Sequence, residues 1–221
     1  MQMDRSFYFD QLYPLQDDAL KIISHAGTGF YLTGGTVVSR VDLKHRFSDD
    51  LDLFVNWNTN YGDWCSQIIE NLQREPQWAL NISMRQPYFT RLFLDRSGIS
   101  LKIELINDVL AHIGEIRNHP EFGRIDSREN ILANKLTALI GRDEPRDLSD
   151  IWGLCSKLGL SIKDAIGGAQ SKSSGIHPID LAHKLCTVTP KQWEQVRWIE
   201  PPDRDQYIAE LFKLGEDLIL V

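Results

Sequence analysis

The alternation of hydrophobic and polar positions predicts a mixture of helices and strands in the first half of the chain. Strict alternation over residues 50–55 and 99–105 predicts two strands, because successive side chains of a strand point to opposite faces. Apolar residues at helical spacing predict a helix over residues 14–26. The other elements expected in this half are helices at 36–41 and 64–74 and strands at 30–32, 78–84 and 88–94. A small mixed sheet with helices is therefore predicted.

The second half of the chain has a helical pattern and no convincing strand. Asp126 and Glu129 form a capping-box-like start of one helix, and Pro145 stands in the first turn of the next. Residues 167–178 are rich in glycine and serine and are predicted to be a loop. We expect an α+β protein with a core domain at residues 1–120 and an all-helical domain at residues 121–221.

Composition and charge narrow the class of protein. Hydrophobic residues make up 42% of the chain and charged residues 25%, which is typical of soluble globular proteins. A net charge of -7 argues against a protein that coats nucleic acid nonspecifically, because such proteins are basic. The first residues lack a signal-peptide pattern, and no apolar run approaches the roughly 20 residues of a membrane span. The three cysteines are widely spaced, so we expect no zinc or disulfide framework and a reduced, cytoplasmic setting.

Two aspartates on one predicted strand are the first candidates for chemistry. Asp50 and Asp52 are two residues apart, so both carboxylates project from the same face and can bind one divalent cation. Mg²⁺ is commonly held by one or two carboxylates together with substrate phosphates. Alternating acids on an exposed strand are more often simply solvated, so this pair alone is a weak signal.

A glycine pair upstream strengthens that signal. Gly34 and Gly35 end a short apolar strand and begin a helix, where backbone N–H groups can bind an anion. Hydroxyl and cationic donors follow at Thr36, Ser39, Arg46 and Ser48. An ordinary strand-to-helix turn with capping hydroxyls is the alternative. Asp50 and Asp52 follow the glycine pair by 15 to 18 residues, so candidate phosphate and metal functions occur in order.

Three separated blocks resemble one protein family. Residues 32–54, which contain Gly-Gly, Ser, Arg-x-Ser and Asp-x-Asp in order, resemble the first motif of the AbiEii/AbiGii-type nucleotidyltransferases. These are toxins of bacterial toxin–antitoxin and phage-defence systems within the DNA polymerase β-like superfamily. Residues 102–104 resemble the strand that bears a third acid, although Glu104 stands where the family commonly has Asp. Residues 134–151 resemble a helical signature of Lys, Arg and Arg-Asp-x-x-Asp.

The resemblance implies a polymerase β-like fold and assigns roles to these residues. Asp50, Asp52 and Glu104 are expected to be catalytic and to hold one or two Mg²⁺ ions, with Mn²⁺ as an alternative, and Glu104 is a candidate proton acceptor. The residues expected to bind the nucleotide are Gly34, Gly35, Thr36, Ser39, Arg46, Ser48, Lys135, Arg146, Asp147 and Asp150.

Two of those roles have structural alternatives. Lys135 lies on a mostly apolar helix face, where its ammonium either faces a phosphate or extends to solvent. Asp147 and Asp150 stand near a helix start, where carboxylates favour the helix dipole. The resemblance suggests instead that one of them orients Lys135 or a nucleotide group.

The implied reaction moves a nucleoside monophosphate from an NTP to a hydroxyl group and releases pyrophosphate. RNA, in particular the 3′ end of tRNA, is the favoured acceptor, and growth arrest is the expected result. An antitoxin need not contact the enzyme. A small-molecule acceptor, as in antibiotic-modifying enzymes, and a nucleotide-binding module without turnover are the alternatives. An RNA acceptor needs a basic track, for which the candidates are Lys157, Lys163, Lys172, Lys184 and Lys191. The tryptophans, among them Trp152, Trp193 and Trp198, are expected in the core or at interfaces rather than as base-stacking platforms.

Overall fold

The computed structural model describes residues 5–219. Residues 1–4 lie outside the described range, and they are part of the segment in which the sequence shows no signal-peptide pattern. Strands and helices both occur throughout the first half, and the chain is a mixed α/β protein. No helix within residues 5–219 combines the length and the apolar character needed to cross a membrane.

The chain forms two compact units that do not follow a single boundary in the sequence. Unit 1 contains residues 1–37, 49–110 and 116–126, and unit 2 contains residues 38–48, 111–115 and 127–221. Two short segments of the first half therefore fold with the helices of the second half. The motif that contains the glycine turn and the aspartates is divided, because residues 38–48 belong to unit 2.

Unit 1 is built on one sheet, which has seven strands within the described residues in the order β3-β4-β5-β2-β1-β7-β6. Its strands are β1 (Tyr31–Thr33), β2 (Leu51–Asn56), β3 (Ala79–Gln86), β4 (Phe89–Arg96), β5 (Ile99–Asp108), β6 (Arg117–His119) and β7 (Gly123–Ile125). The pairs β2–β5 and β1–β7 are parallel, and the other pairs are antiparallel.

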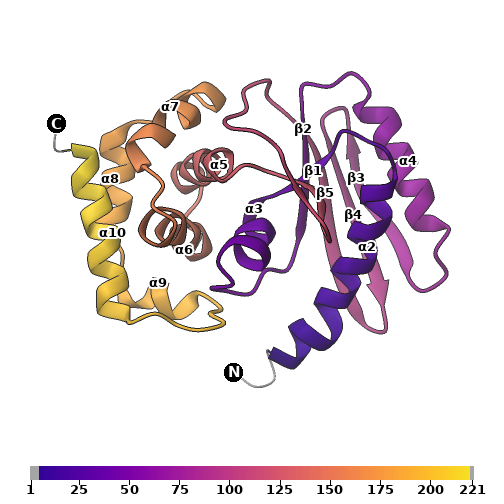
Figure 1. Ribbon diagram of the computed structural model, residues 1–221, viewed down its shortest axis with the longest axis horizontal. Helices are drawn as coiled ribbons and strands as arrows, with labels where there is room; N and C mark the ends of the chain where they lie inside the picture. Colours follow the sequence, from indigo (N-terminus) through magenta and orange to yellow (C-terminus); the bar gives the residue numbers. More distant parts are fainter. Residues whose placement is uncertain (1–4, 220–221) are drawn as a thin grey trace. The chain divides into compact units, whose positions relative to one another are not determined.

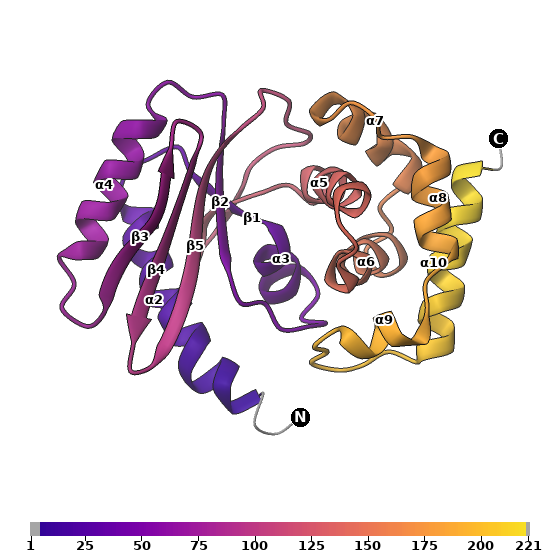
Figure 2. The same ribbon diagram turned by 180° about the vertical axis from the view of Figure 1, so that it is seen from behind.

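Helices cover one face of this sheet. The π-helical segment η1 (Phe7–Leu12) continues into α2 (Tyr13–His25), and α4 (Tyr61–Gln73) packs beside α2. Both helices lie on the same side of the strands (Figures 1 and 2). Leu51, Leu53 and Val55 are buried in β2, whereas the residues between them are half-buried. The alternation in the sequence therefore separates a core face from a face that carries Asp52.

Two strands were not expected from the sequence. β6 and β7 pair with each other through three residues each, and β7 also pairs with β1. Strands of three residues are too short for a recognisable alternation. The region expected to be all-helical, residues 121–221, thus contains the strand β7 near its start. It also contains Trp198, which forms an isolated β-bridge with Arg46.

Unit 2 is mostly helical. After α3 (Gly34–Thr36) of unit 1, the π-helical segment η2 (Val37–Asp42) follows directly in the chain. The later elements are α5 (Arg128–Gly141), α6 (Pro145–Trp152), η3 (Gly153–Lys157), α7 (Ile162–Lys172), α8 (Pro178–Cys186), α9 (Pro190–Gln195) and α10 (Arg204–Ile219). α8 packs against α10, and α5 packs against α7 (Figure 1). The predicted loop at 167–178 is wrong over its first part, because α7 continues through Gly167 and Gly168 to Lys172.

Candidate active site

A row of charged side chains crosses the half-buried face of the sheet in unit 1. Asp52 of β2 and Glu104 of β5 are direct partners in the parallel register, so their Cα atoms are separated by about 4.8 Å, the ordinary strand spacing. Asp50 immediately precedes β2, and Arg91 of β4 pairs with Glu104 from the other side. The register thus brings together carboxylates that are more than fifty residues apart in the sequence.

Two cations contact these carboxylates. The Lys102 ammonium lies 3.0 Å from Oδ2 of Asp50 and 3.5 Å from Oε1 of Glu104. Arg91 donates from Nε to the same Glu104 oxygen at 2.8 Å, and its Nη2 lies 2.7 Å from it. Among the residues that the structure describes, all contacts of Glu104 reach Oε1. Burial, the largest single effect, opposes the charged form of Lys102. The hydrogen bond to Asp50 and the negative charges of Asp50, Glu104 and Asp52 together outweigh it and raise the pKa of Lys102.

The glycine turn lies against the aspartate pair. β1 pairs with β2 so that Thr33 stands opposite Asp52, and Gly34 follows at once with a φ of 70°. A Cβ atom at Gly34 would lie 2.6 Å from Oδ2 of Asp52. Thr36, two residues later, donates its hydroxyl to the backbone oxygen of Asp50 at 2.5 Å. The predicted phosphate-binding and metal-binding segments are therefore neighbours in unit 1.

The donor set in unit 1 is chemically suited to a hard divalent cation. Asp50, Asp52 and Glu104 offer carboxylate oxygens, which Mg²⁺ prefers. The side chains of the described residues form no ready-made group of three or more His, Cys, Asp or Glu around a common metal position. A cation is nevertheless already attracted there, because the Lys102 ammonium bridges Asp50 and Glu104. The chemistry of these carboxylates therefore fits a hard divalent cation.

A second cluster of charges is buried within unit 2. Lys135 of α5 is 7% exposed, and its ammonium lies 2.8 Å from Oδ1 of Asp147 and 2.7 Å from Oδ2 of Asp150. Arg46 donates from Nε and Nη2 to the two oxygens of Asp150, each at 2.7 Å. Arg142 binds Asp147 in the same two-pronged manner. Lys135 is thus paired inside unit 2 instead of extending to solvent.

Ion pairs link the charged groups of this cluster. The cations are Lys135, Arg46 and Arg142, and the carboxylates are Asp147 and Asp150. Burial alone would raise the pKa of both carboxyl groups. Lys135 and Arg142 nevertheless lower the pKa of Asp147, and Arg46 and Lys135 hold the pKa of Asp150 well below its usual range. Both aspartates are therefore carboxylates that bind cations, and Asp147 also stands in the first turn of α6, where a negative charge favours the helix dipole.

The remaining predicted nucleotide-binding residues differ in their accessibility. Ser39 and Ser48 of unit 2 are buried at 1% and 7% exposure. Arg146 lies 3.8 Å from Glu144 and is partly exposed. The Arg46 guanidinium, which the sequence suggested as an open anion donor, is 4% exposed and bound to Asp150. In unit 2 the structure therefore joins Arg46 with Lys135, Asp147 and Asp150.

Three residues of these clusters were missed in the sequence. Arg91 lies on a predicted strand, but only the register of β4 against β5 places it beside Glu104. Arg142 stands in the helical signature without an assigned role. His45 has no metal-ligand spacing, yet its Nε2 lies 3.1 Å from Oδ1 of Asp150 and its ring is 8% exposed. Burial lowers the pKa of His45, so the neutral ring donates from Nε2 to Asp150.

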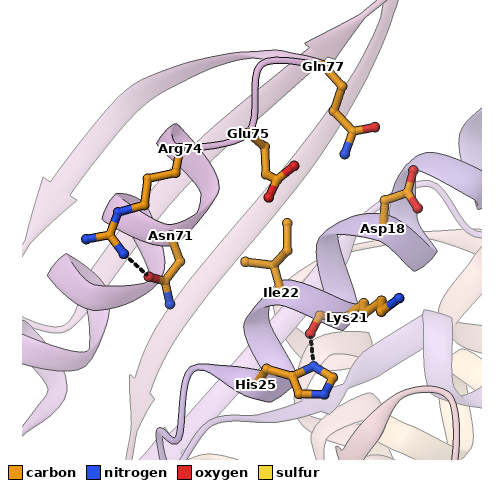
Figure 3. Close-up of a pocket in the computed structure, with 8 residues that line it drawn as sticks. All are labelled: Asp18, Lys21, Ile22, His25, Asn71, Arg74, Glu75 and Gln77. Atoms are coloured by element: carbon orange, nitrogen blue, oxygen red, sulfur yellow. Dashed lines mark hydrogen bonds between the residues drawn. The ribbon is translucent and has the colours of Figure 1, made fainter.

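A surface pocket elsewhere in unit 1 contains none of the predicted site residues. Its volume is about 590 Å³, and it lies between α2 and the end of α4 (Figure 3). Lys21, His25 and Arg74 line it together with Asp18 and Glu75, so its charges are mixed. Two of its polar groups bind within the wall, since His25 contacts the backbone of Lys21 and Arg74 contacts Asn71. We do not assign the reaction to this pocket.

Several solved structures share the fold of this chain, and two of them are named as nucleotidyltransferases. MenT4, the nucleotidyltransferase toxin Rv2826c from Mycobacterium tuberculosis H37Rv, aligns with a TM-score of 0.63 at 15% identity, over 95% of this chain and 83% of that chain. A putative nucleotidyltransferase from Helicobacter pylori aligns with a TM-score of 0.58 at 19% identity, over 92% of this chain and 93% of that chain. JHP933 from Helicobacter pylori also aligns with a TM-score of 0.58 at 19% identity, over 97% of this chain and 91% of that chain. At these identities the alignments establish the fold.

The family follows from the sequence. The model of the family described as "Nucleotidyl transferase AbiEii toxin, Type IV TA system" matches residues 18–207. This match covers most of the chain, so the protein belongs to the AbiEii nucleotidyltransferase toxin family. The resemblance seen in the motifs is confirmed, and the protein is a nucleotidyltransferase. No curated protein matches the sequence.

Proposed function

We propose that this enzyme transfers a nucleoside monophosphate from an NTP to a hydroxyl group of RNA, and that Asp50, Asp52 and Glu104 form its metal site. The observation that carries the proposal is the position of Gly34 against Asp52 in unit 1. It joins the two functions that nucleotidyl transfer requires, an anion-binding turn and adjacent carboxylates. The RNA acceptor, with the 3′ end of tRNA as the first candidate, is supported by membership of a toxin family.

Each part of the site has a chemical role in this proposal. Asp50 and Asp52 would hold one or two Mg²⁺ ions, which supply charge neutralisation at the nucleotide phosphates. Backbone N–H groups after Gly34 bind phosphate oxygens. Arg91 and Lys102 orient Glu104 through Oε1, so Oε2 is the oxygen offered to an incoming ligand. Within unit 2, Lys135 and Arg46 bind Asp147 and Asp150 and hold that part of the helical unit together.

The transfer step balances with the residues of this chain. The acceptor oxygen forms a bond to the α-phosphorus of the NTP, and the bond from that phosphorus to the bridging oxygen of the β-phosphate breaks. Pyrophosphate leaves with the bonding electrons. The acceptor hydroxyl loses its proton, for which the Glu104 carboxylate is the proposed acceptor. Positioning and charge neutralisation supply most of the catalysis of such a reaction.

Incubation with each α-labelled NTP, Mg²⁺ and total RNA tests the proposal. Label is expected in an RNA species with the wild-type enzyme and not with the Asp50→Asn plus Asp52→Asn variant, whose fold is checked by circular dichroism. Transfer by the folded variant would refute the assignment of these acids. Label in a small-molecule fraction would identify the antibiotic-modifying type of reaction, and NTP binding without transfer would identify a non-catalytic module.

The basic track proposed for RNA is already engaged in part. Lys157 lies 3.6 Å from Glu210, Lys172 donates to the backbone oxygen of Ala111 at 2.9 Å, and Lys184 lies 3.6 Å from Asp143. The two ion pairs reduce the positive charge that the helical unit offers to a phosphate backbone, and the hydrogen bond fixes the direction of the Lys172 ammonium. Recognition of an acceptor must then depend on something besides this set of lysines.

A further inference from the structure

Two exposed aromatic rings are stacked at one end of the sheet in unit 1. Trp57 directly follows β2, and Tyr88 directly precedes β4. Their ring centroids are 5.7 Å apart with an angle of 13° between the planes, and the residues are 62% and 54% exposed. By contrast, Trp152 and Trp198 are less than 9% exposed, as expected of core residues. Trp57 is therefore not a core residue, and the expectation of a core or interface position leaves only an interface for it.

The backbone holds Trp57 in an unfavourable conformation. Its φ of 42° lies in the left-handed region, which bulky residues rarely adopt. The segment is fixed on both sides, because the Trp57 N–H donates to the backbone oxygen of Asp108 at 2.9 Å. Asn107 accepts from the Asn58 N–H at 2.9 Å and donates to the Asn58 backbone oxygen at 3.0 Å. Strained backbone persists where surrounding contacts enforce it and is concentrated at functional sites.

A pocket of about 310 Å³ opens beside the two rings. Asn58, Thr59 and Asn107 place polar groups in its wall, and Pro87 adds apolar surface. A positive charge stands nearby, because the Arg85 guanidinium lies 3.5 Å from the backbone oxygen of Gly62, which also lines the pocket. A flat apolar surface, amide groups and a guanidinium together match a nucleobase with its sugar-phosphate.

We propose that this pocket binds a base of a single-stranded RNA acceptor, stacked on Trp57 and Tyr88; this inference rests on the proposed function. Five strand positions separate Asp52 from Trp57 (57 − 52), which corresponds to about 17 Å along β2. That separation is too long for the base of the nucleotide whose phosphate reacts near Asp52. The pocket therefore holds a base farther along the acceptor. Stacking tolerates any base, so the site adds affinity with little sequence preference.

Photo-crosslinking with 12-nucleotide RNA oligomers that carry 5-iodouridine tests this site directly. Without NTP or Mg²⁺, crosslinks are expected at Trp57 or Tyr88, as mapped by mass spectrometry. Trp57→Ala should weaken binding of the same oligomers by about tenfold, and Trp57→Phe should retain most of the affinity. Phe212→Ala removes an aromatic ring that is 44% exposed in unit 2 and is the matched control. Thermal melts establish that each variant is folded.

The outcomes separate this site from the proposed function. Crosslinks only at other residues, equal affinity of wild type and Trp57→Ala, or binding of a proline-rich peptide in place of RNA would each overturn the stacking site. Crosslinks at Trp57 without any label transfer to RNA would support the stacking site and refute the proposed reaction. With active enzyme, Trp57→Ala should raise the KM for RNA and leave the KM for NTP unchanged.

Discussion

A methyl group added to Gly34 would stand 2.6 Å from Oδ2 of Asp52, closer than non-bonded atoms approach each other. Gly34 therefore serves two purposes at once. Its φ of 70° allows the chain to turn from β1 into α3. Its missing side chain lets the backbone approach the carboxylate that we assign to the metal site. The two predicted functions of the motif are coupled through this single contact.

Gly34→Ala is accordingly expected to impair transfer more than stability. The new Cβ must displace the Asp52 side chain, and a misplacement of about 1 Å near reacting groups costs roughly 100-fold in rate. Gly27→Ala is the matched control, because Gly27 has a φ of 66° but a Cβ there would meet no atom within 4 Å. Both variants should lose about 1–2 kcal/mol of stability, because alanine is strained at a positive φ; urea unfolding measures this loss. Equal transfer rates for the two variants would contradict the role of the contact.

Lys102→Met should tighten metal binding. Lys102 places a positive charge against Asp50 and Glu104, where it opposes a second cation. Because the side chain is 28% exposed, solvent screens this effect, and we expect a gain in Mn²⁺ affinity of about 3- to 10-fold at low ionic strength. Isothermal titration with Mn²⁺ measures it, with Lys191→Met as a remote control. Unchanged or weaker Mn²⁺ binding would show that Lys102 does not compete with the ion.

Asp150→Asn should strongly destabilise unit 2. The substitution leaves Arg46 and Lys135 buried without their shared carboxylate, and breaking a buried ion pair in this way costs about 3–5 kcal/mol. Glu70→Gln removes an exposed pair with Arg74 at 3.9 Å and should cost less than about 0.5 kcal/mol. Urea denaturation compares the two. A loss below about 1 kcal/mol for Asp150→Asn would mean that the cluster is not required for the fold.

The buried ring of His45 predicts a loss of stability on mild acidification. Burial lowers its pKa in the folded state, so below the ordinary value of 6.5 the unfolded state binds a proton first. The contribution of the neutral His45 ring to the free energy of unfolding is therefore fully present above about pH 6.5. It decreases as the pH falls, by at most about 1.4 kcal/mol per pH unit. Asp147 and Asp150 contribute in a different window, because their lowered pKa values preserve their stabilisation until the pH falls below 3.8.

Melting temperatures between pH 7.5 and pH 5 test this prediction. His45→Gln, which cannot be protonated, should show a smaller decrease over this range than the wild type. His183→Gln replaces an exposed histidine and serves as the control. An identical pH dependence of wild type and His45→Gln would exclude His45 as the source of the loss.

Local patterns in the sequence determined a large part of this protein. Alternation predicted β2 and β5 and the face that carries Asp52, because every second residue of a half-buried strand must be apolar. The glycine pair and the spaced motifs indicated the family, since backbone geometry and charge at such positions restrict the residues that can serve there. The helix that begins at Arg128 also followed from periodicity, but its N-cap is Ser127, which accepts from the Asn130 N–H, and not the expected Asp126.

Only the tertiary structure decided which distant residues meet. The parallel register of β2 with β5 places Glu104 opposite Asp52, and the packing of unit 2 buries Arg46 against Asp150 instead of leaving it open to an anion. The tertiary structure also places Trp57 on the surface beside Tyr88. Periodicity along a chain reports which face of an element is buried, but not which element covers it. Pairing between segments depends on the combined free energy of many contacts, which no local pattern contains.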